Sequence, residues 1–251
     1  MGKILLFCII DGMKVLTAIL DLIYPRYCLV CNSSLNHTDR RALCPDCTTK
    51  ITFINQDTSC PRCGLDLGPY VQPDTLCQEC HAHPPRFARA IAVAGYDGVI
   101  REAIHKFKYA KERVLLDELS GLLIARWQGV TQLLPQIDMI MPAPLYRGKL
   151  KERGFNQSQL LAERLSQATG IRLEIDNLIK TRPTPDQAGL DSVNRKKNLI
   201  DAFEVTNPKV INGKNILLID DVLTTGATAS EISRTLKKAG AKNVYVLVLA
   251  R

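Results

Sequence analysis

The chain has 251 residues, of which 46% are hydrophobic and 23% are charged, and its formal net charge is +8. This composition excludes an intrinsically disordered chain and is typical of a packed protein with one large domain or two unequal ones. The charge is unevenly divided: residues 1–85 hold 7 basic and 8 acidic side chains, whereas residues 86–251 hold 26 and 17. We therefore expect a polyanionic partner, if there is one, to bind the second part of the chain.

The first 25 residues are expected to form a tail with one amphipathic helix. The apolar run 4–10 is interrupted by Asp11, far short of the about 20 residues that a membrane-spanning helix needs. No clear small-residue cleavage site follows it, so the sequence does not indicate a secretory signal. Residues 14–24 have the pattern of an amphipathic helix that Pro25 ends, and Met13 is the expected start of translation. No stable membrane insertion is expected.

Residues 26–85 are predicted to form a small double zinc ribbon, because they hold eight of the nine cysteines in four Cys-x-x-Cys pairs. Successive pairs are separated by 12, 12 and 13 residues. Each pair directs two thiolates at one point, and two pairs complete a tetrahedral Zn²⁺ site. The eight candidate ligands of two structural Cys₄ zinc sites are Cys28, Cys31, Cys44, Cys47, Cys60, Cys63, Cys77 and Cys80.

Other interpretations of the cysteines are weaker. Disulfides suit a secreted protein, and a thioredoxin-like redox motif needs only one pair. The pairing order is open, since sequential pairing gives two stacked ribbons and cross-braced pairing gives a RING-like weave. Sequential pairing is favoured because loops of about a dozen residues close at little entropic cost. We expect a structural role, because about 60 residues hold too little core to fold without metal.

Residues 86–251 are predicted to form an α/β domain with a doubly wound parallel sheet, because strands alternate with helices. Two continuous apolar runs, 215–219 and 244–249, indicate strands that are buried on both faces. In chain order the sequence predicts a strand at 88–96, helices at 98–107 and 114–127, a strand at 138–141, a helix at 155–169, strands at 178–180 and 215–219, a helix at 228–239 and a strand at 244–249.

The last predicted crossover carries a candidate phosphate site in the sequence ILLIDDVLTTGAT, residues 216–228. Ligands of such folds bind beyond the carboxyl ends of the strands, which is where Asp220 and Asp221 are expected. Gly226 allows a tight turn, and the N–H groups and Thr hydroxyls of the loop can donate to an anion. Paired carboxylates can accept hydrogen bonds from a sugar diol, with Mg²⁺ nearby, so a ribose 5-phosphate fits both features. The alternative is that this segment only caps a helix.

This motif resembles the binding motif for 5-phosphoribosyl-1-pyrophosphate (PRPP) in type I phosphoribosyltransferases. The resemblance implies that the catalytic acids Asp220 and Asp221 contact the ribose hydroxyls, and that the 5-phosphate binds Thr224, Thr225, Gly226, Ala227 and Thr228. Residues 141–158 resemble the pyrophosphate loop of glutamine-dependent amidophosphoribosyltransferases, and residues 181–199 resemble their mobile flap. The first of these likenesses implies that the pyrophosphate of PRPP, which binds together with Mg²⁺, lies near Ala143, Pro144, Leu145, Arg147 and Arg153.

The combination of motifs resembles the ComF family, some of whose members are called GntX-like. It consists of the four cysteine pairs with KFKYAKER (106–113), RGFNQ (153–157), TPDQAGLDSVNRKKN (184–198) and IDDVLTTGAT (219–228). The family has a double zinc ribbon before a phosphoribosyltransferase-like domain and is linked to natural competence, in which DNA enters the cytoplasm as a single strand. The resemblance implies a cytoplasmic protein, peripheral at most to the inner membrane, with a competence helicase or DNA-uptake machinery nearby.

The resemblance leaves two functions open. In one, the domain binds PRPP or a related ribose phosphate and handles single-stranded DNA during natural transformation. The alternative is an active phosphoribosyltransferase that transfers a phosphoribosyl group from PRPP to a nitrogen nucleophile. Thr224 stands where purine-salvage enzymes often carry an acid, so their general base is missing. The candidate DNA contacts come from three basic clusters and are Lys106, Lys108, Lys149, Lys151, Arg195, Lys196 and Lys197.

Overall fold

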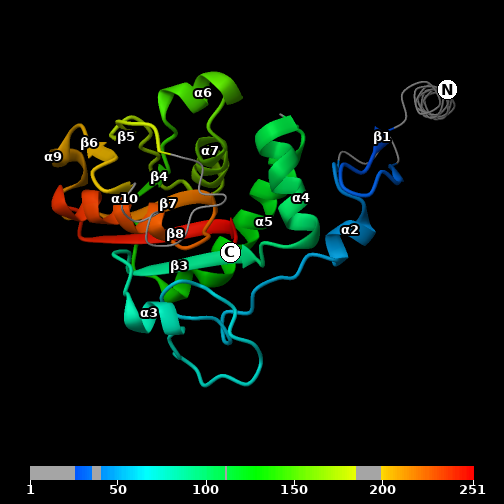
Figure 1. Ribbon diagram of the computed structural model, residues 1–251, viewed down its shortest axis with the longest axis horizontal. Coiled ribbons are helices and arrows are strands. Elements are labelled where there is room, and N and C mark those ends of the chain that lie inside the picture. Colours follow the sequence, from blue (N-terminus) through cyan, green and yellow to red (C-terminus); the bar gives the residue numbers. More distant parts are fainter. Residues whose placement is uncertain (1–25, 36–40, 111, 185–198) are drawn as a thin grey trace, which may run out of the picture.

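The computed structural model describes residues 26–35, 41–110, 112–184 and 199–251 (Figure 1). The amphipathic helix predicted at 14–24 and the expected start at Met13 lie outside these residues. Most of the predicted flap lies outside them too, and with it the candidate DNA contacts Arg195, Lys196 and Lys197.

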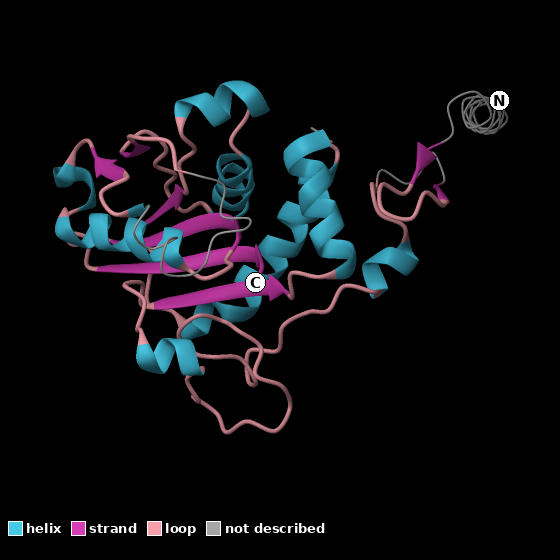
Figure 2. Ribbon diagram, in the orientation of Figure 1, coloured by secondary structure: helices cyan, strands magenta, loops and turns pink. Residues whose placement is uncertain are grey.

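A parallel sheet with the strand order β3-β8-β7-β4 forms the centre of the domain (Figure 2). In one row across it, Ala90, Val246, Leu218 and Met141 lie side by side. Five of the eight residues of β7 and seven of the eight residues of β8 are buried, because both faces of the sheet are covered. This confirms the predicted fold class. The strands are β3 (Arg89–Ala94), β4 (Met139–Pro142), β7 (Asn215–Val222) and β8 (Asn243–Ala250).

Helices cover both faces of the sheet, as expected for a doubly wound fold. One face packs against α4, α5 and α7, and the other packs against α10. Asn156 caps α7, since its Oδ1 accepts a hydrogen bond from the N–H of Ser158 at 3.1 Å. These elements are α4 (Gly98–His105), the π-helix η1 (Lys106–Ala110), α5 (Leu115–Val130), the 3₁₀ turn η2 (Thr131–Leu133), α7 (Gln157–Thr169) and α10 (Ala227–Lys238).

Several small elements complete the domain, and the sequence predicts only β5 among them. β5 pairs with β6 in an antiparallel ribbon outside the main sheet. β6 has a glutamate between its two hydrophobic residues and so forms no apolar run, and α6 has no buried residue and so shows no apolar periodicity. These elements are α6 (Arg147–Arg153), β5 (Leu178–Lys180), β6 (Phe203–Val205) and α9 (Pro208–Ile211).

The cysteine-rich part forms two modules that lie on different sides of β3 (Figure 1). The first packs into the core with Ile91 and Val93, whereas the second packs into the core with Ala90 and Ala92. Side chains of a strand alternate between faces, so the two modules lie against opposite faces of the sheet. The prediction of two stacked ribbons is therefore wrong. The elements are β1 (Arg26–Tyr27), β2 (Ser34–Leu35) and α2 (Pro45–Thr49) in the first module and α3 (Gln78–Ala82) in the second.

Each module is attached to the domain by specific polar or close contacts. Glu118 of α5 accepts hydrogen bonds through Oε1 from the N–H groups of Ala42 and Leu43, both at 3.0 Å. In the second module Gly64 has a φ of +69°, and a Cβ there would lie 3.0 Å from the carbonyl oxygen of Ala90. These contacts make the modules part of the same packed unit as the sheet.

The Glu118 contact gives a stability prediction. We expect Glu118→Ala to lower the free energy of unfolding by about 2 kcal/mol, because two buried backbone donors lose a charged acceptor. Urea denaturation in excess zinc measures this change. Asp117→Ala is the matched control, since it removes a neighbouring carboxylate whose pair with Arg164 is largely exposed, at 2.9 Å. Equal losses in the two variants would contradict the prediction.

Candidate functional site

Two adjacent carboxylates lie at the carboxyl end of β7, which extends to Val222 and so beyond the predicted end of the strand. Asp220 Oδ1 accepts hydrogen bonds from Ser158 Oγ at 2.8 Å and from the N–H of Asp221 at 2.9 Å. Asp221 is 4% exposed, and its Oδ2 forms an ion pair with Lys108 Nζ. Burial raises the pKa of Asp220, whereas the Ser158 hydrogen bond and the nearby cations act against that rise. The pair is therefore partly desolvated and suited to cations and hydroxyl donors.

The carboxylates line a cavity of about 460 Å³, which we call the acid cavity. Two lysines also line it: Lys108 from η1 and Lys180 from the end of β5. Burial lowers the pKa of each lysine to about 8, and the Asp220 carboxylate partly opposes this fall. At neutral pH the cavity thus holds two acids beside two cations, an arrangement that can bind a ligand with both hydroxyl and phosphate groups.

The predicted phosphate loop joins β7 to α10 through Gly226, whose φ is +75°. This left-handed conformation favours glycine, because a side chain there would be strained. Thr224 and Thr228 line the acid cavity, whereas Thr225, Gly226 and Ala227 line a second cavity of about 630 Å³ beside the second cysteine module. The loop therefore separates two cavities. The acid cavity is the better ligand site although it is smaller, because the buried charged groups converge there.

The loop after β4 supplies another wall of the acid cavity. Its residues Ala143, Pro144 and Leu145 line the cavity together with Thr224 and Thr228 of the phosphate loop. Asn156 Nδ2 donates a hydrogen bond to the carbonyl oxygen of Ala143 at 3.0 Å, while Asn156 Oδ1 caps α7. One side chain therefore attaches this loop to the helix that carries Ser158, and through Ser158 to the acids.

The two arginines predicted to bind pyrophosphate do not line the acid cavity. Arg147 lines a neighbouring cavity of about 510 Å³, which shares Pro144, Leu145 and Lys180 with the acid cavity. The guanidinium carbon of Arg153 lies 5.2 Å from the centre of the Tyr109 ring. Arg153 is still close enough to oppose the rise in the pKa of Asp220. Their contacts with pyrophosphate stay predictions.

The described candidate DNA contacts divide into two groups. Lys149 and Lys151 lie on α6, and Lys106 begins η1, so these three lie outside the acid cavity. Lys108 points into the cavity, its side chain is 17% exposed, and it is paired with Asp221. Lys108 is therefore better placed to contact a ligand in the cavity than to contact a DNA backbone on the surface.

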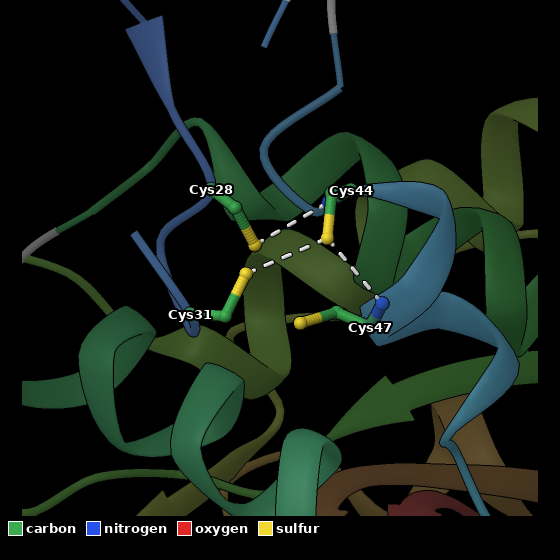
Figure 3. A group of neighbouring side chains, drawn as sticks. All are labelled: Cys28, Cys31, Cys44 and Cys47. Carbon is green, nitrogen blue, oxygen red and sulfur yellow. Dashed lines mark hydrogen bonds between the residues drawn. The ribbon is translucent and has the colours of Figure 1, made fainter. Parts of the chain in front are cut away.

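The eight paired cysteines form two clusters of four thiols, each assembled from consecutive pairs (Figure 3 shows the first). The sulfurs of a cluster all lie within 4.8 Å of one another, and the Sγ atoms are 3.6 Å apart in both Cys31–Cys44 and Cys63–Cys77. A tetrahedral zinc with Zn–S bonds of about 2.3 Å places its sulfurs about 3.8 Å apart. Both clusters thus fit zinc, and the preference for sequential pairing is confirmed.

The sequence does not predict three residues that complete the acid cavity. Ser158 and Gln157 lie in the segment that resembles a pyrophosphate loop, but their place in the cavity and the bond of Ser158 to Asp220 need the packing of α7 beside β7. Lys180 ends a three-residue strand, and a lysine directly after the apolar pair Leu178–Ile179 is the one local signal for it. Nothing in the spacing along the chain places it beside Asp220.

In comparisons with known proteins, each of the two parts of the chain matches a known domain family. The double zinc ribbon domain matches residues 19–83, and the phosphoribosyl transferase domain matches residues 153–251. A DNA utilization protein YhgH of Escherichia coli is 35% identical over 196 residues, covering 77% of this chain and 84% of that protein. Competence protein F of Haemophilus influenzae is 31% identical over 228 residues, covering 89% of this chain and 96% of that protein. The glutamine PRPP amidotransferase of B. subtilis, a solved structure, is 22% identical, with a TM-score of 0.35, and covers 53% of this chain and 25% of that one.

The parallel sheet, the paired acids before a Thr/Gly loop and the preceding ribbons define a phosphoribosyltransferase-like protein with a double zinc ribbon. Its relatives at more than 30% identity include DNA utilization and competence proteins. The chain belongs to the ComF family, which confirms the resemblance of its motifs. Within the described part of the chain, no helix has both the length and the apolar character needed to cross a bilayer.

The charge arrangement of the acid cavity gives a prediction for its lysines. We expect Lys108 and Lys180 to titrate near pH 8, and Asp220→Asn to lower both pKa values further, because the variant removes a carboxylate that favours the ammonium form. NMR of selectively labelled lysine side chains measures both, with assignment by Lys→Arg variants. Asp138→Asn is the control, since Asp138 pairs with Lys214 outside the acid cavity. Unchanged lysine pKa values in Asp220→Asn would refute the proposed coupling.

Proposed function

We propose that this ComF-family protein binds PRPP or a related ribose phosphate in the acid cavity, together with Mg²⁺. The observation that carries the proposal is the convergence of Asp220, Asp221, Lys108 and Lys180 on one cavity of about 460 Å³ beside the phosphate loop. A phosphorylated pentose carries hydroxyl donors and phosphate anions on one small molecule. It therefore complements acids and cations that lie next to each other.

Each group has a defined task in this proposal. Asp220 and Asp221 accept hydrogen bonds from the ribose hydroxyls, while Thr224 and Thr228 donate to the 5-phosphate. Mg²⁺, when bound, neutralises phosphate oxygens, and carboxylates are its preferred protein ligands. In this proposal Lys108 releases Asp221 and pairs with the ligand phosphates, while Mg²⁺ would offset the carboxylate charge that Lys108 leaves behind.

Replacing both acids tests the ligand. We expect the double variant Asp220→Asn, Asp221→Asn to lose measurable PRPP binding in isothermal titration calorimetry with Mg²⁺, because the hydroxyl acceptors lose their charge and Mg²⁺ loses its ligands. Asp138→Asn is the matched control, a carboxylate beside the amino end of β7, where its Oδ2 accepts from the N–H of Asn215 at 2.8 Å. The assignment fails if the double variant binds PRPP as tightly as the wild type does.

We also propose that the protein handles single-stranded DNA during natural transformation, in the cytoplasm and close to the uptake machinery. The excess of basic side chains in residues 86–251 supports this, as do Lys149 and Lys151 on α6 and the DNA-related names of the relatives. Cations on the surface of α6 suit a nucleotide chain, because its backbone carries a phosphate charge at every residue.

The DNA proposal predicts a salt dependence. We expect Lys149→Gln with Lys151→Gln to weaken binding of an oligothymidine and to reduce the slope of log affinity against log salt by about 1.4, because two phosphate contacts are lost. Fluorescence anisotropy at several salt concentrations measures this slope. Lys237→Gln with Lys238→Gln is the control, two exposed lysines at the far end of α10. A salt-independent affinity in the wild type would overturn the proposal.

An active phosphoribosyltransferase is the alternative, and the paired acids beside two cations favour it. Such groups can stabilise the charges that develop when pyrophosphate leaves the ribose. Thr224 lines the cavity but supplies no carboxylate base. Release of pyrophosphate from PRPP in the presence of a nucleobase or an amine distinguishes a transferase from a binding module.

A further inference from the structure

Arg251 joins the second cysteine cluster to the phosphate loop. Its Nη2 donates a hydrogen bond to Cys63 Sγ at 3.1 Å, and its Nη1 donates to the carbonyl oxygens of Leu223 and Thr224, at 3.1 and 2.5 Å. The backbone of Arg251 is held as well, since its N–H donates to Ala94 O at 3.0 Å. One guanidinium thus spans two parts of the molecule that lie far apart in the chain.

The two carbonyls that Arg251 holds are at the start of the phosphate loop. Their peptide planes decide where the following N–H groups and Thr side chains point, since the loop turns only three residues later at Gly226. A guanidinium presents its donors in a rigid plane, so two carbonyls on one nitrogen fix orientation as well as distance. Arg251 therefore stabilises the loop conformation from the side that faces away from the acid cavity.

The hydrogen bonds of Arg251 lie beside a space that packing leaves open. The cavity of about 630 Å³ lies between the second module and the loop, and Cys63, Arg251, Thr225 and Gly226 are among its lining residues. Cysteines of the second module pack with Leu223 and Ala227 in one hydrophobic core, but atoms that face the cavity have no packing partner on that side. The hydrogen bonds of Arg251 cross this gap at its edge.

The strength of the Cys63 contact depends on the charge of the sulfur. A neutral thiol is a weak acceptor, whereas a zinc tetrathiolate carries a charge of roughly −2 and attracts a guanidinium. Arg251 Nε is buried without a hydrogen-bond partner among the described residues, so the cation depends on nearby negative charge for its stability. A metal ion in this cluster would hold all four cysteines as thiolates, and the net negative charge of those thiolates would stabilise the guanidinium.

We propose that Arg251 is a positioning residue through which the metal of the Cys60–Cys63–Cys77–Cys80 cluster stabilises the phosphate loop. The inference rests on the proposed ribose phosphate site and adds that metal occupancy and ligand affinity are coupled. Coupling free energies are reciprocal, so a ligand at the loop also changes the environment of the metal. The first cluster, which lies against the other face of the sheet, has no part in this coupling.

The test uses cadmium-113 NMR of the full chain with cadmium in both clusters, titrated with ribose 5-phosphate and Mg²⁺. We expect the ligand to shift the resonance of the second cluster and to leave that of the first unchanged. In Arg251→Met we expect the ligand-induced shift to vanish and affinity by calorimetry to fall about tenfold, because the loop loses a charged donor. Ser33→Ala is the matched control, since Ser33 Oγ lies 3.1 Å from Cys31 Sγ in the first cluster. It should move the first resonance alone and keep full affinity.

The outcomes separate the two proposals. If the wild type does not bind ribose 5-phosphate, the proposed function fails and the inference fails with it. If the wild type binds, but Arg251→Met binds equally well and the second resonance does not respond, the ligand site stands and the coupling is refuted. Arg251→Lys covers the case in which the Met variant does not fold. Lysine keeps a positive charge near Cys63 but lacks the planar set of donors that holds both carbonyl oxygens. A nearly normal cadmium resonance of the second cluster together with weaker binding of ribose 5-phosphate therefore supports the inference. Full affinity for ribose 5-phosphate in this variant refutes it.

Discussion

The structure depends on how two neighbouring carboxylates are neutralised where a buried strand ends. Like charges side by side in a partly desolvated site repel, and isolated buried charges are costly. Three groups stabilise the carboxylates: the Ser158 hydroxyl of α7, the Lys108 ammonium of η1 and the Lys180 ammonium at the end of β5. These elements converge on β7 from different parts of the sequence. The compensation is thus distributed over the fold, and a cavity with both signs of charge is its result.

The cysteine modules extend the domain and are not a separate cap. Each contributes cysteine side chains to one of the two hydrophobic cores, and β3 lies between them. Glu118 attaches the first module to α5, and Arg251 attaches the second to the phosphate loop. Metal bound in these clusters would therefore stabilise the faces of the sheet as well as the modules. This explains how a short cysteine-rich segment with little core of its own can be ordered.

Features with a local or periodic signal could be predicted from the sequence. The parallel strands follow from continuous apolar runs, and the grouping of the thiols follows from the even spacing of their pairs. The loop at Gly226 follows from its Thr/Gly composition after a strand. Features that depend on tertiary packing could not be predicted. Lys180 and Ser158 share a cavity with Asp220 only because the end of β5 and the start of α7 both line it, and no spacing along the chain encodes that arrangement.

The placement of β3 at the edge of the sheet has a kinetic consequence. Its one partner in the main sheet is β8, with Arg89 opposite Tyr245, so this pairing must close a very long loop. Non-local parallel pairing is slow to form, whereas a knuckle closed by a dozen residues can assemble early during synthesis. We expect both cysteine modules to capture metal while the rest of the polypeptide is still emerging from the ribosome. Backbone of the cysteine-rich part pairs with the outer edge of β3, through Ile54 N–H to Val93 O and Ala90 N–H to Arg62 O, and so protects that edge from intermolecular association.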